Sequence, residues 1–147
     1  MKPFLSAVFA VSAFSFAAQA EDAGIDLVPF DGTYEDASFA VENAILNEGL
    51  VIDYVSHVGD MLARTKEDVG GSVDLYKAAD VYLFCSAVVS RKVMEADPLN
   101  IAHCPYGVFV IETENGVSIG HRQYPDGPMQ EVEALLDGIV KEAASFN

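Results

Sequence analysis

Hydrophobic positions along the chain follow two spacings, one typical of helices and one typical of strands. Apolar residues recur every three or four positions over 35–48 and over 129–143, which predicts two amphipathic helices. A nearly continuous apolar run over 79–85 predicts a central strand buried on both faces. Shorter helices are predicted over 60–69 and, after a serine that can cap a helix, over 86–96.

The remaining apolar segments predict further strands. Residues 50–58 are rich in β-branched side chains, and a proline limits 25–30 to an edge strand or a loop. The runs 106–111 and 117–122 flank an Asn-Gly pair at 115–116, which predicts a β-hairpin. The expected fold class is therefore α+β, a compact two-layer sandwich with one mainly antiparallel sheet and helices packed on one face.

The N-terminus has the pattern of an export signal. Residues 1–20 place Lys2 before an uncharged apolar run and end in the small-x-small sequence of a signal-peptidase site, with cleavage after Ala20. The run is too short and too rich in Ala and Ser for a permanent membrane anchor. We therefore expect a periplasmic or secreted protein, with an N-terminal extension over 21–34 and a single α+β domain over 35–147.

Composition narrows the function. The 147 residues contain 8 Lys and Arg against 23 Asp and Glu, a formal net charge of −15. This balance argues against nucleic acid or an anionic membrane as the main partner, and it leaves a basic protein or a small ligand. The sequence has no nucleophile elbow, phosphate loop or zinc-protease motif. A non-catalytic role is therefore favoured over an enzymatic one.

The candidate chemistry lies between residues 85 and 106. Cys85 ends the predicted strand and directly precedes the expected N-cap residue Ser86, where the helix dipole favours a thiolate. Cys104 lies in the loop that enters the next strand and is followed by Pro105. Both cysteines are thus expected at strand ends, which makes them candidates for one shared site.

Three roles for the cysteines remain open. They could form a structural disulfide around 18 intervening residues, which would add about 3 kcal/mol of stability in an oxidising compartment. They could act as a thiol redox pair, although the Cys-x-x-Cys spacing is missing. They could also hold haem or a soft metal ion, since a Cys-Pro thiolate is a recurrent ligand of haem iron.

Two histidines extend the candidate cofactor site, which comprises Cys104, Cys85, His103 and His121. His103 precedes Cys104, but in an extended chain the two side chains would point to opposite faces. His121 continues the face of its strand that carries Val117 and Ile119, so it is expected to point inward. The acidic surface would repel the negatively charged propionates of a haem, which counts against haem as the ligand.

Three stretches of the sequence resemble the DUF302 family (domain of unknown function 302). They are 82–87 (YLFCSA), 94–98 (MEADP) and 104–106 (CPY), followed by Arg122 and Pro125. The resemblance extends over residues 35–125. It implies a small α+β fold that associates as a homodimer, and it implies no established catalytic activity. The two cysteines belong to a subgroup pattern, so the resemblance assigns them no role.

Overall fold

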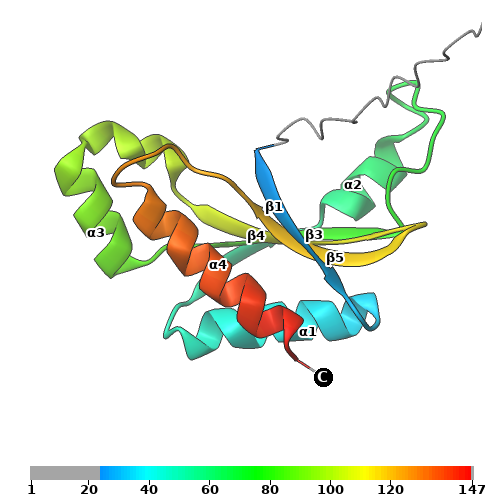
Figure 1. Ribbon diagram of the computed structural model, residues 1–147. Helices are drawn as coiled ribbons and strands as arrows, with labels where there is room; N and C mark the ends of the chain where they lie inside the picture. Colours follow the sequence, from blue (N-terminus) through cyan, green and yellow to red (C-terminus); the bar gives the residue numbers. More distant parts are fainter. Residues whose placement is uncertain (1–23, 147) are drawn as a thin grey trace, which may run out of the picture.

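The computed structural model describes residues 24–146, and the predicted signal peptide over 1–20 lies outside these residues. Strands and helices alternate along the chain, which ends in a hairpin and a helix (Figure 1). The elements are β1 (Ile25–Phe30), α1 (Tyr34–Asn47), β2 (Ile52–Ser56), α2 (Val58–Thr65), β3 (Ala78–Phe84), α3 (Ala87–Ala96), the 3₁₀ helix η1 (Pro98–His103), β4 (Tyr106–Thr113), β5 (Gly116–Arg122) and α4 (Gln130–Ala144).

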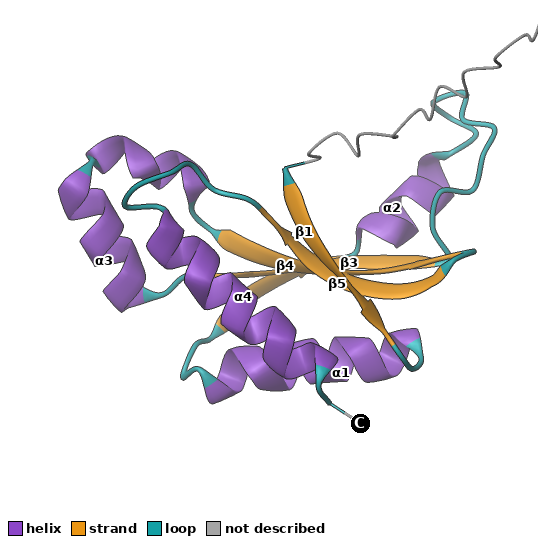
Figure 2. Cartoon of the chain, in the orientation of Figure 1, coloured by secondary structure: helices purple, strands orange, loops and turns teal. Residues whose placement is uncertain are grey.

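The five strands form one antiparallel sheet in the order β1-β5-β4-β3-β2 (Figure 2). β4 and β5 form the predicted hairpin, in which Thr113 pairs with Gly116. Gly116 has a φ of 110°, a conformation that glycine adopts without a Cβ clash.

Helices α1 and α4 pack side by side on one face of the sheet and form the core with it (Figure 1). α1 begins with a capping box, in which the side chains of Thr33 and Asp36 each accept a backbone N–H of the other residue. α4 buries a stripe at helical spacing: Val132, Leu136, Ile139, Val140 and Ala143. Within residues 24–146, none of the helices has the length and apolar character needed to span a bilayer.

The opposite face of the sheet is covered only in part. α2 contacts β3 there, and Gly59 permits this approach, because a Cβ at that position would lie 2.7 Å from the backbone nitrogen of Ala79. Beyond α2, the face presents Leu27, which is 47% exposed, and half-buried Val81 and Phe109. A hollow of about 260 Å³ with an apolar lining lies on the same face.

The expected fold class, an antiparallel sheet with helices packed against it, is confirmed. The helices predicted over 35–48 and 129–143 are present, and 25–30, expected within an N-terminal extension, forms the edge strand β1 of the sheet. The predicted burial of 79–85 on both faces is wrong, because helices cover mainly one face and leave Val81 half-exposed. The helix predicted over 60–69 instead spans Val58–Thr65.

Candidate functional site

Cys85 and Cys104 lie near each other at one end of the sheet, beside the ends of the interior strands β3 and β4. Phe84, the last residue of β3, pairs with Tyr106, the first residue of β4. The two cysteines lie just beyond these paired ends, and the Cys104 thiol is close enough to raise the pKa of Cys85. Both are free thiols; Cys85 is exposed and Cys104 is half-buried. The strand register therefore brings together the two cysteines that the sequence placed at strand ends.

Local hydrogen bonds fix the backbone on both sides of the thiols. The hydroxyl of Ser86 accepts the N–H of Val89 at 3.3 Å, which caps α3 as predicted. The backbone N–H of Cys104 donates to the carbonyl oxygen of Ile101 at 3.1 Å, at the end of η1. The Cys104–Pro105 peptide bond is cis. The two sulfur-bearing residues thus lie on backbone segments that are each held by a helix end.

The surroundings of Cys85 favour its neutral form. Partial desolvation of the exposed Cys85, the neighbouring Cys104 thiol and the carboxylate of Asp53 together raise the pKa of Cys85 to about 11. A backbone hydrogen bond at Tyr106 opposes this shift. The raised pKa is opposite to the expectation that a helix N-terminus would favour the Cys85 thiolate; its main causes are desolvation and the neighbouring Cys104 thiol.

Aromatic side chains surround the thiol pair. Tyr106 is fully buried, and its hydroxyl hydrogen bonds with Ser90 Oγ at 3.0 Å. The ring of Tyr124 contacts those of His103 and Tyr106 edge-on, with centroid separations of 5.7 and 6.2 Å. Burial is the main cause that raises the pKa of Tyr124 to about 12. His103 ends a 3₁₀ helix, so the extended geometry assumed for it from the sequence does not apply.

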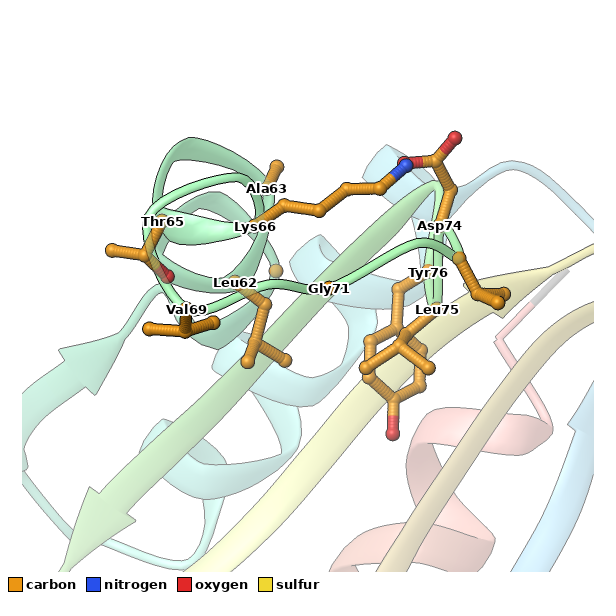
Figure 3. A pocket seen from close by; sticks show the side chains of 11 residues that line it. Leu62, Ala63, Thr65, Lys66, Val69, Gly71, Asp74, Leu75 and Tyr76 are labelled. Carbon is orange, nitrogen blue, oxygen red and sulfur yellow. The ribbon is translucent and has the colours of Figure 1, made fainter.

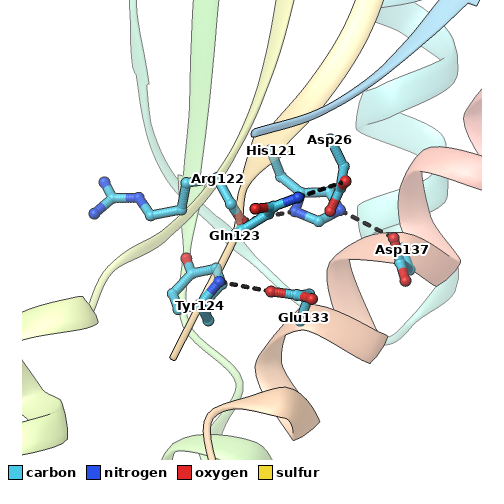
Figure 4. A network of polar contacts seen from close by, with 7 residues as sticks. All are labelled: Asp26, His121, Arg122, Gln123, Tyr124, Glu133 and Asp137. Carbon is cyan, nitrogen blue, oxygen red and sulfur yellow. Dashed lines mark hydrogen bonds and ion pairs between the residues drawn. The ribbon is translucent and has the colours of Figure 1, made fainter. Parts of the chain in front are cut away.

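His121 lies in a different polar cluster (Figure 4). It points inward as expected and is fully buried. Its Nδ1 lies 2.8 Å from the carbonyl oxygen of Arg122, and its Nε2 lies 3.2 Å from a carboxylate oxygen of Asp137 in α4. Asp26 of β1 is opposite His121 in the sheet, and its carboxylate accepts a hydrogen bond from Gln123 at 3.1 Å. The structure therefore partners His121 with two aspartates from other elements, in a cluster that includes neither cysteine.

Sequence reasoning missed both aspartates of this cluster. One signal was available for Asp26, because alternation along β1 places it on the same face as the core residues Val28 and Phe30. No comparable signal marked Asp137, which lies beside the buried stripe of α4. Its approach to His121 depends on how α4 packs on the sheet, which periodicity does not specify.

His57 takes part in a third polar arrangement, with Asp80. It precedes α2, and its Nδ1 lies 2.8 Å from a carboxylate oxygen of Asp80. A pocket of about 440 Å³ adjoins this pair, with Tyr34 and Tyr82 in its lining. Burial and the Asp80 carboxylate raise the pKa of Tyr34 above its ordinary range. The imidazole of His57 is 61% exposed, so this pair is open to solvent.

A smaller pocket of about 110 Å³ lies between α2 and the segment that follows it (Figure 3). Leu62 and Tyr76 lie on its two sides, and an ion pair of 2.7 Å between Lys66 and Asp74 closes one end. The cysteines and histidines singled out from the sequence do not line it. One short helix and the loop that follows it form the walls of this pocket, and we assign it no function.

The fold and its polar clusters define a small α+β sandwich domain with two thiols at one end of its sheet. Among solved structures, the chain is similar to an uncharacterized conserved DUF302 protein from Bacillus stearothermophilus, with a TM-score of 0.66. The likeness covers 82% of this chain and 98% of that chain at 14% sequence identity. No protein-family model and no curated protein matches the sequence. The comparison thus supports a DUF302-like fold, and at this identity it shows the fold alone.

Proposed function

We propose that this protein is an exported, non-catalytic binding protein that holds a soft metal ion between the thiolates of Cys85 and Cys104. The observation that carries this proposal is the position of the two cysteines just beyond the paired ends of β3 and β4, where the Cys104 thiol affects the pKa of Cys85. Thiolates are the ligands that select soft ions such as Cu(I). The paired ends of β3 and β4 hold both cysteines in place, so the two thiolates form a ligand pair without a large rearrangement of the chain.

The raised pKa of Cys85 argues against a reactive thiolate at neutral pH. A pKa of about 11 leaves the thiol protonated at neutral pH, so it is a poor nucleophile there. A metal ion replaces the thiol protons and binds both sulfurs as thiolates. The net charge of −15 also raises the local concentration of cations around the protein. These features support a metal-binding role more than the thiol redox role.

The same thiol pair also suits a structural disulfide, the main alternative. In an oxidising compartment two neighbouring thiols close readily, and a loop of this length stabilises a domain by about 3 kcal/mol. Under this alternative the protein is an interaction module that binds a basic protein, and the thiols have no ligand. The number of thiols that react once a chelator has removed any bound metal, in protein recovered from the periplasm without reductant, distinguishes the two accounts.

Haem is the second ligand that we propose for Cys104. A Cys-Pro thiolate is chemically suited to haem iron, and the rings of His103 and Tyr124 contact each other in this region. A single domain of this size offers little apolar wall for a macrocycle, so haem would need the interface of a dimer. Haem binding would appear as a saturable Soret band that is lost in Cys104→Ser.

We propose that a second copy of the chain covers the open face of the sheet. Leu27, Val81 and Phe109 lie on this face, and apolar side chains on neighbouring strands suit a self-complementary contact. A homodimer is also what the DUF302 resemblance implies. Sedimentation of the purified protein tests this, with Leu27→Lys as the variant expected to be monomeric. Wild-type protein that sediments as a monomer at high concentration contradicts the homodimer.

The test of the main proposal is a Cu(I) titration of fully reduced residues 21–147 in competition with a chromogenic Cu(I) chelator. We expect one Cu(I) per chain, and at least a hundredfold loss of affinity in Cys85→Ser and in Cys104→Ser. The matched control is Ser90→Ala, which removes a hydroxyl near the site but leaves both sulfurs. Equal affinity in the wild type and in both cysteine variants would refute the proposal.

A further inference from the structure

A second ligand site lies in the core, apart from the thiols. Asp26 on β1, His121 on β5 and Asp137 on α4 each bring one possible ligand atom into the same region (Figure 4). These three atoms all lie within 4.8 Å of one another. The three residues are far apart in the sequence and come from three elements, so the arrangement is held by the tertiary fold.

The hydrogen bonds of His121 determine which of its nitrogens is free. Nδ1 lies 2.8 Å from the carbonyl oxygen of Arg122, which can only accept, so Nδ1 carries a proton. In a neutral imidazole, Nε2 then has a lone pair and no proton. That lone pair faces the carboxylate oxygen of Asp137 at 3.2 Å. Two acceptors in contact repel each other unless a cation lies between them or beside them.

Basic side chains do not supply this cation within residues 24–146. The ion pairs of the described residues join neither Asp26 nor Asp137 to a lysine or an arginine. Arg122 contributes its carbonyl, while its guanidinium extends away from the carboxylates (Figure 4). The remaining candidates for the cation are a proton on Nε2 and a metal ion.

Several features favour a metal ion. An imidazole that donates its second N–H to a backbone carbonyl is the usual arrangement of a metal-binding histidine. Gln123 donates to the carboxylate of Asp26 and orients it in the same way. The side chain of Asp137 is 45% exposed, which gives an ion a route from solvent. Ligands of one zinc ion lie up to about 4 Å apart, so His121 Nε2 and Asp137 at 3.2 Å already suit one ion, and a small shift of the Asp26 carboxylate closes the cluster.

We propose that Asp26, His121 and Asp137 form a binding site for a divalent transition-metal ion of the zinc class. One imidazole and two carboxylates supply nitrogen and oxygen ligands, which suit Zn²⁺ or Mn²⁺ rather than the soft ions that thiolates select. Water completes the coordination on the exposed side of Asp137. This site is independent of the thiol pair and of the function proposed for it.

The test is a calorimetric Zn²⁺ titration of the full mature chain that carries Cys85→Ser and Cys104→Ser, so that thiols do not bind the probe. We expect one Zn²⁺ per chain and at least a tenfold weaker affinity after Asp137→Asn. Asp137 is half-exposed, so this variant is expected to fold. The matched control is Asp126→Asn, an exposed acid outside the cluster, which is expected to change the affinity by less than twofold.

Nitrogen NMR of His121 supplies the second readout. On addition of Zn²⁺, we expect the Nε2 signal to move to that of a metal-bound nitrogen while Nδ1 keeps its proton. Three results would overturn the proposal: no saturable Zn²⁺ binding at millimolar concentration, an affinity that Asp137→Asn leaves unchanged, or a proton on Nε2 that Zn²⁺ does not displace. The last result would assign the cluster to a buried imidazolium.

Discussion

The two polar clusters at one end of the sheet differ in burial and in how they are held. His121 is fully buried, and its ring nitrogens contact a backbone carbonyl and a carboxylate from another element. Cys85 and Cys104 lie beyond the strand ends, partly open to solvent, and have mainly each other as polar partner. His121 is therefore part of the core, whereas the two thiols lie outside it, and we expect a change at the thiols to disturb the fold less.

The largest effect on stability is expected at the buried cluster. His121→Ala removes the hydrogen bond to the Arg122 carbonyl and leaves a polar cavity, which we expect to cost about 2–4 kcal/mol of unfolding free energy. Urea denaturation with a chelator present measures this change. His57→Ala is the matched control, because that histidine also contacts an aspartate but is 61% exposed; its cost should stay below about 1 kcal/mol. Equal costs for the two variants would contradict the comparison.

Removal of the hydroxyl group is expected to lower stability moderately at Tyr106 and not to lower it at Tyr124. The Tyr106 hydroxyl hydrogen bonds with Ser90, so Tyr106→Phe should cost about 1 kcal/mol. The buried Tyr124 hydroxyl has no hydrogen-bond partner among the described residues, so Tyr124→Phe should leave stability unchanged or slightly raise it. Thermal unfolding of both variants checks the difference. A cost at Tyr124 equal to that at Tyr106 would mean that the Tyr124 hydroxyl has a partner in solution.

A small effect on stability is also expected at the thiols. With reductant present, Cys85→Ser should change the unfolding free energy by less than about 0.5 kcal/mol, because the residue is exposed and outside the core. Chemical denaturation of the reduced protein tests this value. A loss of about 3 kcal/mol that occurs only without reductant would instead identify a structural disulfide.

The pH dependence of Cys85 alkylation tests the environment of the thiols without a mutation. Because the pKa of Cys85 is about 11, compared with 9.0 for a free thiol, its alkylation should be slow at neutral pH and should rise until about pH 11. The matching stability contribution is complete below pH 9 and is lost as the pH rises towards 11, since the unfolded thiol ionises first. Mass spectrometry of the alkylated peptide reports the rate. A plateau below pH 9 would contradict the raised pKa.

The sequence predicted the parts of the fold that depend on local pattern. Spacing or turn chemistry within a few residues predicts the buried stripe of α4, the N-cap at Ser86 and the hairpin of β4 and β5. The same local signals placed Cys85 and Cys104 at strand ends. They became neighbours only through the pairing of β3 with β4.

The polar clusters needed information that periodicity lacks. Asp26 meets His121 through the register of β1 on β5, and Asp137 joins them through the packing of α4. Both relations are long-range in sequence. The partial exposure of β3 was missed for a similar reason, because an apolar run has the same composition whether one face or both are covered.

The most direct test of the proposed function is an X-ray absorption spectrum of copper bound to the fully reduced wild-type protein. The account predicts that Cu(I) is coordinated by two sulfur atoms, one from Cys85 and one from Cys104, and that either serine substitution removes this signature. A spectrum with only nitrogen and oxygen neighbours around the copper would contradict the account.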